Sequence, residues 1–219
     1  MPSQTVYIVD DDEAVRDSLV MLITSMGMAA VPFDSAETFL EAAKRSPDQL
    51  SGCCVLDVRM PGMSGIEIQN QLNTMGINLP CIMVSGFGDV PSTVDSFKAG
   101  AMDFLEKPFN EQQLLDRVQA ALIWDAEQRK FSEKLAEISM RHNRLTPRER
   151  QVMELVVQGK LNKQIAAELG LSHKTIEVHR AHVMDKMQAD SLAHLVRMAM
   201  TLKQAERYAR PLIKPPMYN

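Results

Sequence analysis

Two hydrophobic periodicities divide the chain. In its first part, short apolar runs alternate with segments whose apolar residues recur every three or four positions, as on one face of a helix. The apolar runs predict strands at residues 5–9, 28–31, 53–56, 81–84 and 102–106. The segments between them predict helices at residues 13–25, 35–44, 64–76, 90–99 and from 110 onward. This alternation predicts an α/β domain over residues 1–122, with a doubly wound five-stranded parallel sheet.

The last of these helices has no evident stop. Beyond residue 122 a narrow apolar stripe continues through Phe131, Leu135 and Ile138 among charged residues. We therefore expect a helical linker over residues 123–143. The stripe could pair with a copy of itself, but it holds fewer than three clean heptads and does not by itself indicate a coiled coil.

The remaining pattern is helical throughout. Thr146, Pro147 and Glu149 form a capping-box sequence that opens the first helix. The predicted helices cover residues 146–159, 163–169, 173–187 and 191–203. Gly170 lies in the short turn between the second and third helices, and the third helix is basic, which indicates a helix-turn-helix. We expect a small all-α four-helix domain at residues 144–207 and a disordered tail at residues 208–219.

Charge separates the same two parts. Up to Arg141 there are 11 Lys and Arg against 21 Asp and Glu, whereas from His142 onward there are 13 against 7. The basic second part favours a polyanionic partner, although an accident of surface charge is the alternative. The three cysteines lie in predicted strands and are expected to be buried and reduced. The sequence shows neither a signal segment nor an apolar stretch long enough to cross a membrane, which predicts a cytoplasmic protein.

Four predicted strands end in residues with useful chemistry: Asp10 and Asp11, then Asp57, Ser85 and Lys107. The carboxyl ends of parallel strands share one edge, so these side chains are expected to converge. Neighbouring carboxylates repel unless a cation lies between them, and Mg²⁺ prefers hard oxygen ligands while leaving room for phosphate oxygens. The pattern therefore predicts a site for Mg²⁺ and a phosphoryl group.

In this interpretation Asp57 is the nucleophile that attacks phosphorus, Lys107 pairs with the phosphoryl oxygens and Ser85 donates a hydrogen bond to one of them. Singly, each residue has a plainer explanation: the aspartates could cap a helix, and Lys107 and Ser85 could be surface or turn residues. The stretch from Gly86 to Gly88 lacks the third glycine of a dinucleotide fingerprint and the lysine of a phosphate-binding loop, so we reject a nucleotide site there.

These residues carry a resemblance. The motifs VDDD ending at Asp12, DVRMPGMSG from Asp57, SG at Ser85 and EKPF around Lys107 resemble the flavodoxin-like receiver domain of bacterial two-component response regulators. The motifs TPRERQ from Thr146 and KTIEVHR at residues 174–180 resemble the LuxR-type DNA-binding domain of the NarL/FixJ subfamily.

The resemblance implies that a partner histidine kinase phosphorylates Asp57 with Mg²⁺ bound. The implied metal ligands are Asp11 and Asp57, with Asp10 assisting and the backbone carbonyl of Arg59 as a further ligand. A receiver of this kind acts on its own phosphoryl group and is not an enzyme with an external substrate.

The same resemblance implies that Ser85 and Phe104 form a switch pair. The serine hydroxyl follows the phosphoryl group and the phenylalanine ring turns inward. The peptide bond between Lys107 and Pro108 is expected to be cis.

Basic side chains on the third helix of the second domain would neutralise DNA phosphates. The predicted DNA-binding residues are Lys174, Thr175, Glu177, Val178, His179, Arg180, Ala181 and Lys186. The resemblance places base contacts at Glu177, Val178 and Ala181. Glu177 departs from the basic residue found there in many subfamily members, but a carboxylate can accept a hydrogen bond from cytosine N4. The helix at 191–203 is a dimer contact in the family, and core packing is the alternative explanation of its apolar residues.

We therefore expect a transcription regulator switched by phosphorylation. Its expected partners are a sensor histidine kinase, double-stranded DNA, a second copy of itself when phosphorylated, and RNA polymerase as a further candidate. Two alternatives remain at this point. One is a phosphotransfer intermediate or protein-binding regulator whose second domain binds a protein, and the other is a metal-dependent aspartyl-phosphate phosphatase of small substrates. The phosphatase would need a second acid two residues after Asp57, where Arg59 stands.

Overall fold

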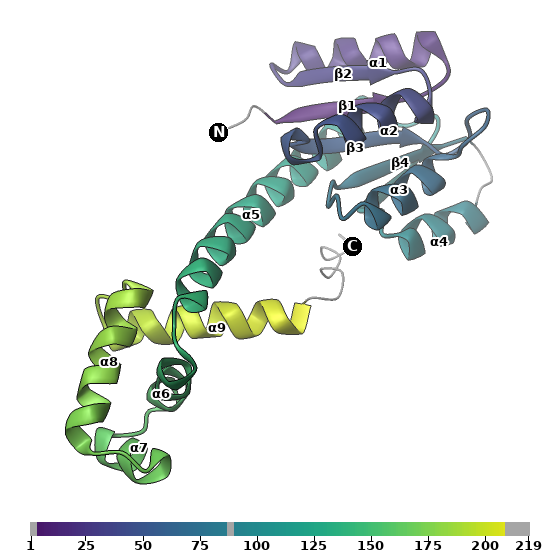
Figure 1. Cartoon of the computed structure of the whole chain (residues 1–219). Helices are drawn as coiled ribbons and strands as arrows, with labels where there is room; N and C mark the ends of the chain where they lie inside the picture. The colour runs from purple at the N-terminus through teal and green to yellow at the C-terminus, as the bar shows by residue number, and fades with distance from the viewer. Residues whose placement is uncertain (1–3, 87–89, 209–219) are drawn as a thin grey trace. The chain divides into compact units, whose positions relative to one another are not determined.

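The computed structural model describes residues 4–86 and 90–208, which form two compact units that divide after Arg129 (Figure 1). The first unit holds a five-stranded parallel sheet of strand order β2-β1-β3-β4-β5. The strands are β1 (Thr5–Val9), β2 (Ala29–Phe33), β3 (Gly52–Asp57), β4 (Cys81–Ser85) and β5 (Asp103–Glu106). The predicted doubly wound α/β fold is confirmed.

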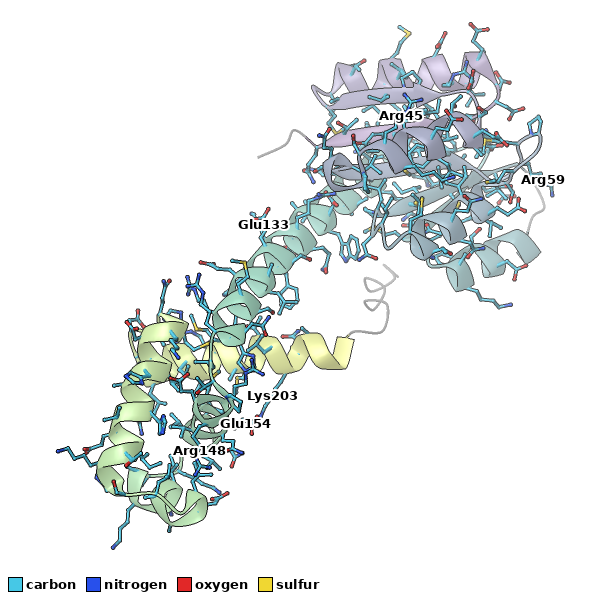
Figure 2. The ribbon with its side chains drawn as sticks, viewed as in Figure 1. Arg45, Arg59, Glu133, Arg148, Glu154 and Lys203 are labelled. Atoms are coloured by element: carbon cyan, nitrogen blue, oxygen red, sulfur yellow. The ribbon has the colours of Figure 1, made fainter. Side chains whose placement is uncertain are left out.

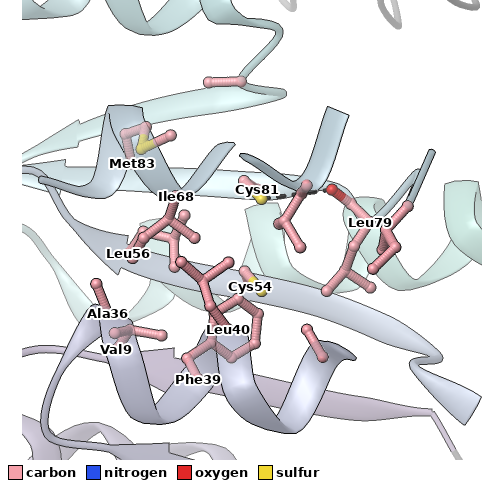
Figure 3. Close-up of a cluster of buried hydrophobic side chains, with 14 of the residues drawn as sticks. Val9, Ala36, Phe39, Leu40, Cys54, Leu56, Ile68, Leu79, Cys81 and Met83 are labelled. Carbon is pink, nitrogen blue, oxygen red and sulfur yellow. Dashed lines mark hydrogen bonds between the residues drawn. The ribbon is translucent and has the colours of Figure 1, made fainter. Parts of the chain in front are cut away.

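Helices cover both faces of this sheet. They are α1 (Glu13–Ser25), α2 (Ala36–Arg45), α3 (Gly65–Thr74), α4 (Val90–Ala99) and α5 (Glu111–Asn143), with a short 3-10 helix η1 (Pro47–Gln49). One core packs α2 and α3 against the sheet through Phe39 and Ile68 (Figure 3). The other core packs α1 and α5 through Ile23 and Leu114. The sheet is thus buried on both faces, which is why its central strands are continuous apolar runs.

The cysteines follow this two-faced burial. Cys54 and Cys81 lie in the core with α2 and α3, whereas the adjacent Cys53 lies in the opposite core. All three are free and buried, as expected. Burial raises the pKa of the Cys53 thiol far above its ordinary value, so it stays protonated and unreactive.

Strand β2 differs from its prediction. It runs from Ala29 to Phe33 and includes Pro32, whereas the sequence predicted residues 28–31. Pro32 pairs with Ile8 of β1 on one side only, because β2 is an edge strand. An edge strand tolerates proline since one row of its N–H groups has no partner in the sheet. Strand β5 likewise begins at Asp103 rather than at residue 102.

The second unit is helical and surrounds its own core. It contains α6 (Pro147–Val157), α7 (Asn162–Leu169), α8 (His173–Met187) and α9 (Leu192–Tyr208), and residues near the end of α5 complete the core. Thr146 accepts the N–H of Glu149 in the predicted capping box, and Gly170 ends α7 with φ of 64°. A left-handed C-cap favours glycine. The turn places α7 and α8 as a helix-turn-helix.

Helix α5 continues without interruption for 33 residues, as the missing stop signal indicated. The domain boundaries at 122, 143 and 207 stay predictions. The expected disordered tail at 208–219 lies, apart from Tyr208, outside the described residues. Within residues 4–86 and 90–208, every helix is too short or too polar to cross a membrane.

Candidate functional site

The ammonium of Lys107 joins two carboxylates at the carboxyl edge of the sheet. Its Nζ lies 2.8 Å from Oδ2 of Asp10 and 3.0 Å from Oδ1 of Asp57. Asp10 follows β1, Asp57 ends β3 and Lys107 follows β5, so three strands bring these residues together. Both carboxylates are buried, with 3% and 8% of the residue exposed. The predicted convergence of these three residues is therefore present.

Burial and charge act against each other at Asp57. Burial raises the pKa of this carboxyl group above its ordinary value, the nearby Asp10 raises it further, and the hydrogen bond from Lys107 opposes both. Burial alone would lower the pKa of Lys107, but its hydrogen bonds to Asp10 and Asp57 raise it overall. Lys107 therefore stays charged and serves as the cation between the two carboxylates.

The other two predicted metal ligands, Asp11 and Arg59, lie at the same edge of the sheet in different surroundings. Asp11 is exposed, and the backbone N–H of Arg59 donates to Oδ2 of Asp57 at 3.2 Å. Figure 2 shows Arg59 at the edge where the strands end. Among the described residues, no three His, Cys, Asp or Glu side chains are grouped closely enough to hold an ion. The chemistry of the donors, carboxylate and carbonyl oxygens at one edge, nevertheless fits Mg²⁺.

Ser85 and Phe104 occupy neighbouring strands. Ser85 ends β4, is fully buried, and its carbonyl accepts the N–H of Lys107 at 2.7 Å. Phe104 pairs in register with Met83 of β4 and is partly buried against the core that contains α2 and α3. The peptide bond between Lys107 and Pro108 is cis, as expected. The role of Ser85 and Phe104 as a switch pair stays a prediction.

The candidate nucleic-acid interface lies on α8. Ser172 caps this helix by accepting the N–H of Thr175 at 3.1 Å. Four of the predicted DNA-binding residues are exposed and lie at helical spacing along one outward face: Lys174, Glu177, Val178 and Ala181. Oε1 of Glu177 lies 3.5 Å from Nδ1 of His173.

His179 and Arg180 lie closer to the rest of the unit. Both are partly buried, and Nη1 of Arg180 donates to Oδ1 of Asn162, the first residue of α7, at 3.0 Å. Nδ1 of His179 is buried and has no hydrogen-bond partner in the part of the chain that the structure describes.

Lys186 turns away from the exposed face of α8. Its Nζ bonds both carboxylate oxygens of Glu149, at 2.9 and 2.6 Å, and Glu149 is buried. Burial alone would raise the pKa of Glu149, but the hydrogen bonds from Lys186 and from the N–H of Thr146 lower it to about 2. The predicted contact of Lys186 with DNA stays a prediction that must compete with this pair.

Sequence reasoning missed the second partner of Glu149 and also missed Asp125. The capping box explained Glu149 fully, and Lys186 lies 37 positions away. Asp125 is 1% exposed in α5, yet in the sequence it is one of many charged residues in the linker. Neither long-range pair leaves a periodic signal in the sequence.

Comparison with known families divides the chain in the same way. Residues 6–119 match the family described as the response regulator receiver domain. Residues 143–199 match the family described as bacterial regulatory proteins, luxR family.

Similar proteins span nearly the whole chain. Nodulation protein W of Bradyrhizobium diazoefficiens is 46% identical over 197 residues, which cover 90% of this chain and 86% of that protein. The transcriptional regulatory protein FixJ of Rhizobium meliloti is 46% identical over 200 residues, 91% of this chain and 97% of that protein. The response regulator protein TodT of Pseudomonas putida is 43% identical over 203 residues, which cover 93% of this chain and 88% of that protein.

Solved structures show the same relationship. The response regulator StyR has 46% sequence identity and a TM-score of 0.78, covering 90% of this chain and 98% of that one. Full-length FixJ from B. japonicum has 43% sequence identity and a TM-score of 0.57, and the match covers 93% of this chain and 99% of that one.

Proposed function

The chain belongs to the two-component response regulators that carry a LuxR-type DNA-binding domain, and from this membership we propose that Asp57 accepts the phosphoryl group. The protein is a DNA-binding transcriptional regulator of the NarL/FixJ kind, not a classical enzyme. Its receiver domain implies a sensor kinase as partner, and its LuxR-type domain implies binding to DNA.

The observation that supports this assignment is the bridge from Lys107 to Asp10 and Asp57. A carboxylate oxygen of Asp57 attacks phosphorus, and the bond from phosphorus to the nitrogen of the kinase histidine breaks. The incoming phosphoryl group carries about −1.5 to −2 charge. Lys107 already contacts this carboxylate and can pair with the phosphoryl oxygens. Its ammonium therefore neutralises the new negative charge without a large movement of the side chain.

Receiver domains of this family bind Mg²⁺. We assign its binding to the carboxylates of Asp11 and Asp57, with Asp10 and the backbone carbonyl of Arg59. When bound, the ion neutralises charge on the phosphoryl oxygens. The ammonium of Lys107 separates Asp10 from Asp57 in this structure, so these residues are arranged to hold positive charge.

The switch depends on where the phosphoryl group sits. Ser85 ends the strand next to β3, so its hydroxyl can turn toward a phosphoryl group on Asp57, and Phe104 on β5 can fill the space that it leaves. This repacking would favour a homodimer that binds DNA through paired α8 helices. RNA polymerase is a further proposed partner. Because bacterial chromosomal DNA lies in the cytoplasm, we assign the protein to that compartment.

The test is phosphoryl uptake by the full chain from acetyl phosphate with Mg²⁺ present. The wild-type chain and the control variant Asp116→Asn, which changes an exposed aspartate on α5, should be labelled with one phosphoryl group. Asp57→Asn should take up none. Labelling of Asp57→Asn to the wild-type level would refute the assignment of Asp57.

A further inference from the structure

We propose that Glu149 is a positioning residue for the recognition helix α8, which it holds through Lys186, and that Lys186 makes no contact with DNA phosphates. This inference rests on the proposed role of α8 in DNA binding. It concerns how that helix is fixed and which of its cations DNA neutralises.

Glu149 has two tasks in the structure. It is the third residue of α6, where its Oε2 accepts the N–H of Thr146 at 2.8 Å and completes the capping box. The same carboxylate accepts both hydrogen bonds from Lys186 on α8. A capping residue is ordinarily solvent-exposed, but the side chain of Glu149 is only 4% exposed. The buried carboxylate therefore joins the start of α6 to the end of α8.

Lys186 lies in the last turn of α8, next to Met187, which is fully buried in the core of the second unit. Apolar contacts of Ile176 and Val183 determine which face of α8 is buried in the core of the second unit. Apolar packing is non-directional, whereas the pair between Lys186 and Glu149 has fixed distances and angles. The ion pair therefore sets the rotation of α8 and its position along its own axis.

Transfer of Lys186 to a DNA phosphate would leave Glu149 buried with hydrogen bonds from Thr146 alone and without its cation. A buried carboxylate that loses its cation carries a large penalty, larger than an exposed lysine gains from a phosphate. His182 is the other cationic candidate nearby, with Nδ1 at 3.6 Å from Oε1 of Glu149, but its side chain is 57% exposed. Lys186 therefore remains with Glu149 when DNA binds.

Lys174 offers the contrast on the same helix. It lies in the first turn of α8, where the helix-turn-helix presents side chains to the major groove, and its side chain is exposed. Within the described residues it has neither an ion pair nor a side-chain hydrogen bond. Lys174 is therefore available to a phosphate, whereas Lys186 is not.

The dependence of DNA affinity on salt separates the two roles. Each lysine that neutralises a phosphate releases counterions and contributes about 0.9 to the slope of log K against log salt concentration. A positioning residue changes affinity through the alignment of base contacts and leaves that slope unchanged. Misalignment of one good base contact costs about ten-fold in affinity.

The experiment uses the full chain and a fluorescein-labelled duplex that the wild-type protein has selected from a random library. Binding is measured by anisotropy over a salt series, for Lys186→Met and for the matched control Lys174→Met. Lys186→Met should weaken binding about ten-fold with an unchanged slope. Lys174→Met should lower the slope by about 0.9. Lys186→Arg keeps the cation and should retain most of the affinity.

Glu149→Gln supplies a second, independent arm. It should weaken binding as much as Lys186→Met does, and the double variant should be no weaker than either single variant, because both act through one pair. Circular dichroism establishes that each variant is folded at the assay temperature. Should Lys186→Met unfold, Glu149→Gln and Lys186→Arg carry the comparison.

Two outcomes overturn the inference. A slope lowered by about 0.9 in Lys186→Met makes Lys186 a phosphate contact. Unchanged affinity in both Lys186→Met and Glu149→Gln shows that the pair does not position α8. If α8 does not bind DNA at all, the result is different: Lys174→Met then changes neither the affinity for DNA nor the slope of its salt dependence.

Discussion

The carboxylate of Asp125 accepts the backbone N–H of Gly52 at 2.9 Å, although the two residues lie 73 positions apart. Asp125 belongs to α5, and Gly52 is the first residue of β3, the strand that ends in Asp57. Nε of Arg129, one turn further along α5, bonds the same carboxylate at 2.9 Å. Arg129 also donates to the carbonyl of Leu50. Residues of α5 beyond 122 are thus fixed to the beginning of the strand that carries the proposed phosphoacceptor.

Asp125→Ala should destabilise the first unit. The substitution leaves the N–H of Gly52 buried without its partner and removes the counter-charge of Arg129, a loss of roughly 1–3 kcal/mol. The measurement is urea unfolding followed by the fluorescence of Trp124, the single tryptophan of the chain. Glu127→Ala on the exposed side of α5 is the control and should leave the midpoint unchanged. Equal midpoints for the two variants would contradict the anchoring role.

The sequence predicts the site at the carboxyl edge of the sheet because general rules of α/β folds say where the residues that follow each strand must lie. Apolar runs give the strands, parallel strands align their carboxyl ends, and the residues at those ends must meet. Asp10, Asp57 and Lys107 were predicted on that basis, and the structure joins them. The rule gives the edge but not the contacts along it, so it did not show that the ammonium of Lys107 bridges the carboxylates of Asp10 and Asp57 directly.

The contacts of Asp125 and Lys186 could not be predicted in the same way. Each is a charged residue in a charged helix, a pattern that ordinarily indicates a solvated face. Their partners lie far away in the sequence, and the pairing depends on how the helix is rotated against its neighbour. Periodicity identifies the apolar face of a helix, but it does not identify which polar residue at the border of that face becomes buried.

Lys107→Ala should separate metal binding from activation. Without the ammonium, Oδ2 of Asp10 and Oδ1 of Asp57 lack the cation that now bridges them, and Mg²⁺ no longer competes with it. Calorimetry should show that Mg²⁺ still binds, about ten-fold more tightly, or ~1.4 kcal/mol. The increase in DNA affinity caused by acetyl phosphate should be lost. Lys98→Ala, which removes an exposed lysine, is the control, and loss of Mg²⁺ binding in Lys107→Ala alone would oppose the proposal.

The stability of the second unit should depend on pH through Glu149. Its pKa is lowered from an ordinary value of 4.5 to about 2, since the hydrogen bonds from Lys186 and Thr146 outweigh the effect of burial. A lowered pKa contributes stability that is fully present above pH 4.5 and is lost as the pH falls toward 2. Glu149→Gln should therefore melt roughly 5 °C lower than wild type at pH 6.

The gap between Glu149→Gln and wild type should narrow steadily below pH 4.5. Circular dichroism of the full chain measures both melting curves, and the exposed Glu154→Gln on the same helix is the control. A gap that stays constant down to pH 3 would mean that Glu149 acts through its shape and not through its charge.

Arg180→Ala should weaken DNA binding across all sequences more than it changes the preference among them. The guanidinium is bound by Asn162 at the start of α7 and lies away from the exposed residues of α8 that we propose read base edges, so we expect it to contact the DNA backbone. Affinity should fall about ten-fold and the salt slope by about 0.9. Arg45→Ala, an exposed arginine of the first unit, is the control. An altered order of preferred sites in a binding selection would contradict a backbone role.

Glu177→Gln should change which base is read. The side chain of Glu177 is 56% exposed and stands beside the exposed Val178 on the outward face of α8. A carboxylate accepts a hydrogen bond from cytosine N4, whereas a glutamine amide forms a bidentate contact with adenine N6 and N7. The discrimination at this position should therefore move from cytosine to adenine by roughly 1–3 kcal/mol.

Selection from a randomised duplex library measures this change directly. The wild-type protein, Glu177→Gln and the control Glu168→Gln, an acid of α7 that pairs with Lys160, are compared under identical salt. One position in each half-site should change in Glu177→Gln while the flanking positions keep their preferences. If the selected sites are identical for all three proteins, Glu177 faces no base, and its carboxylate serves only to hold His173.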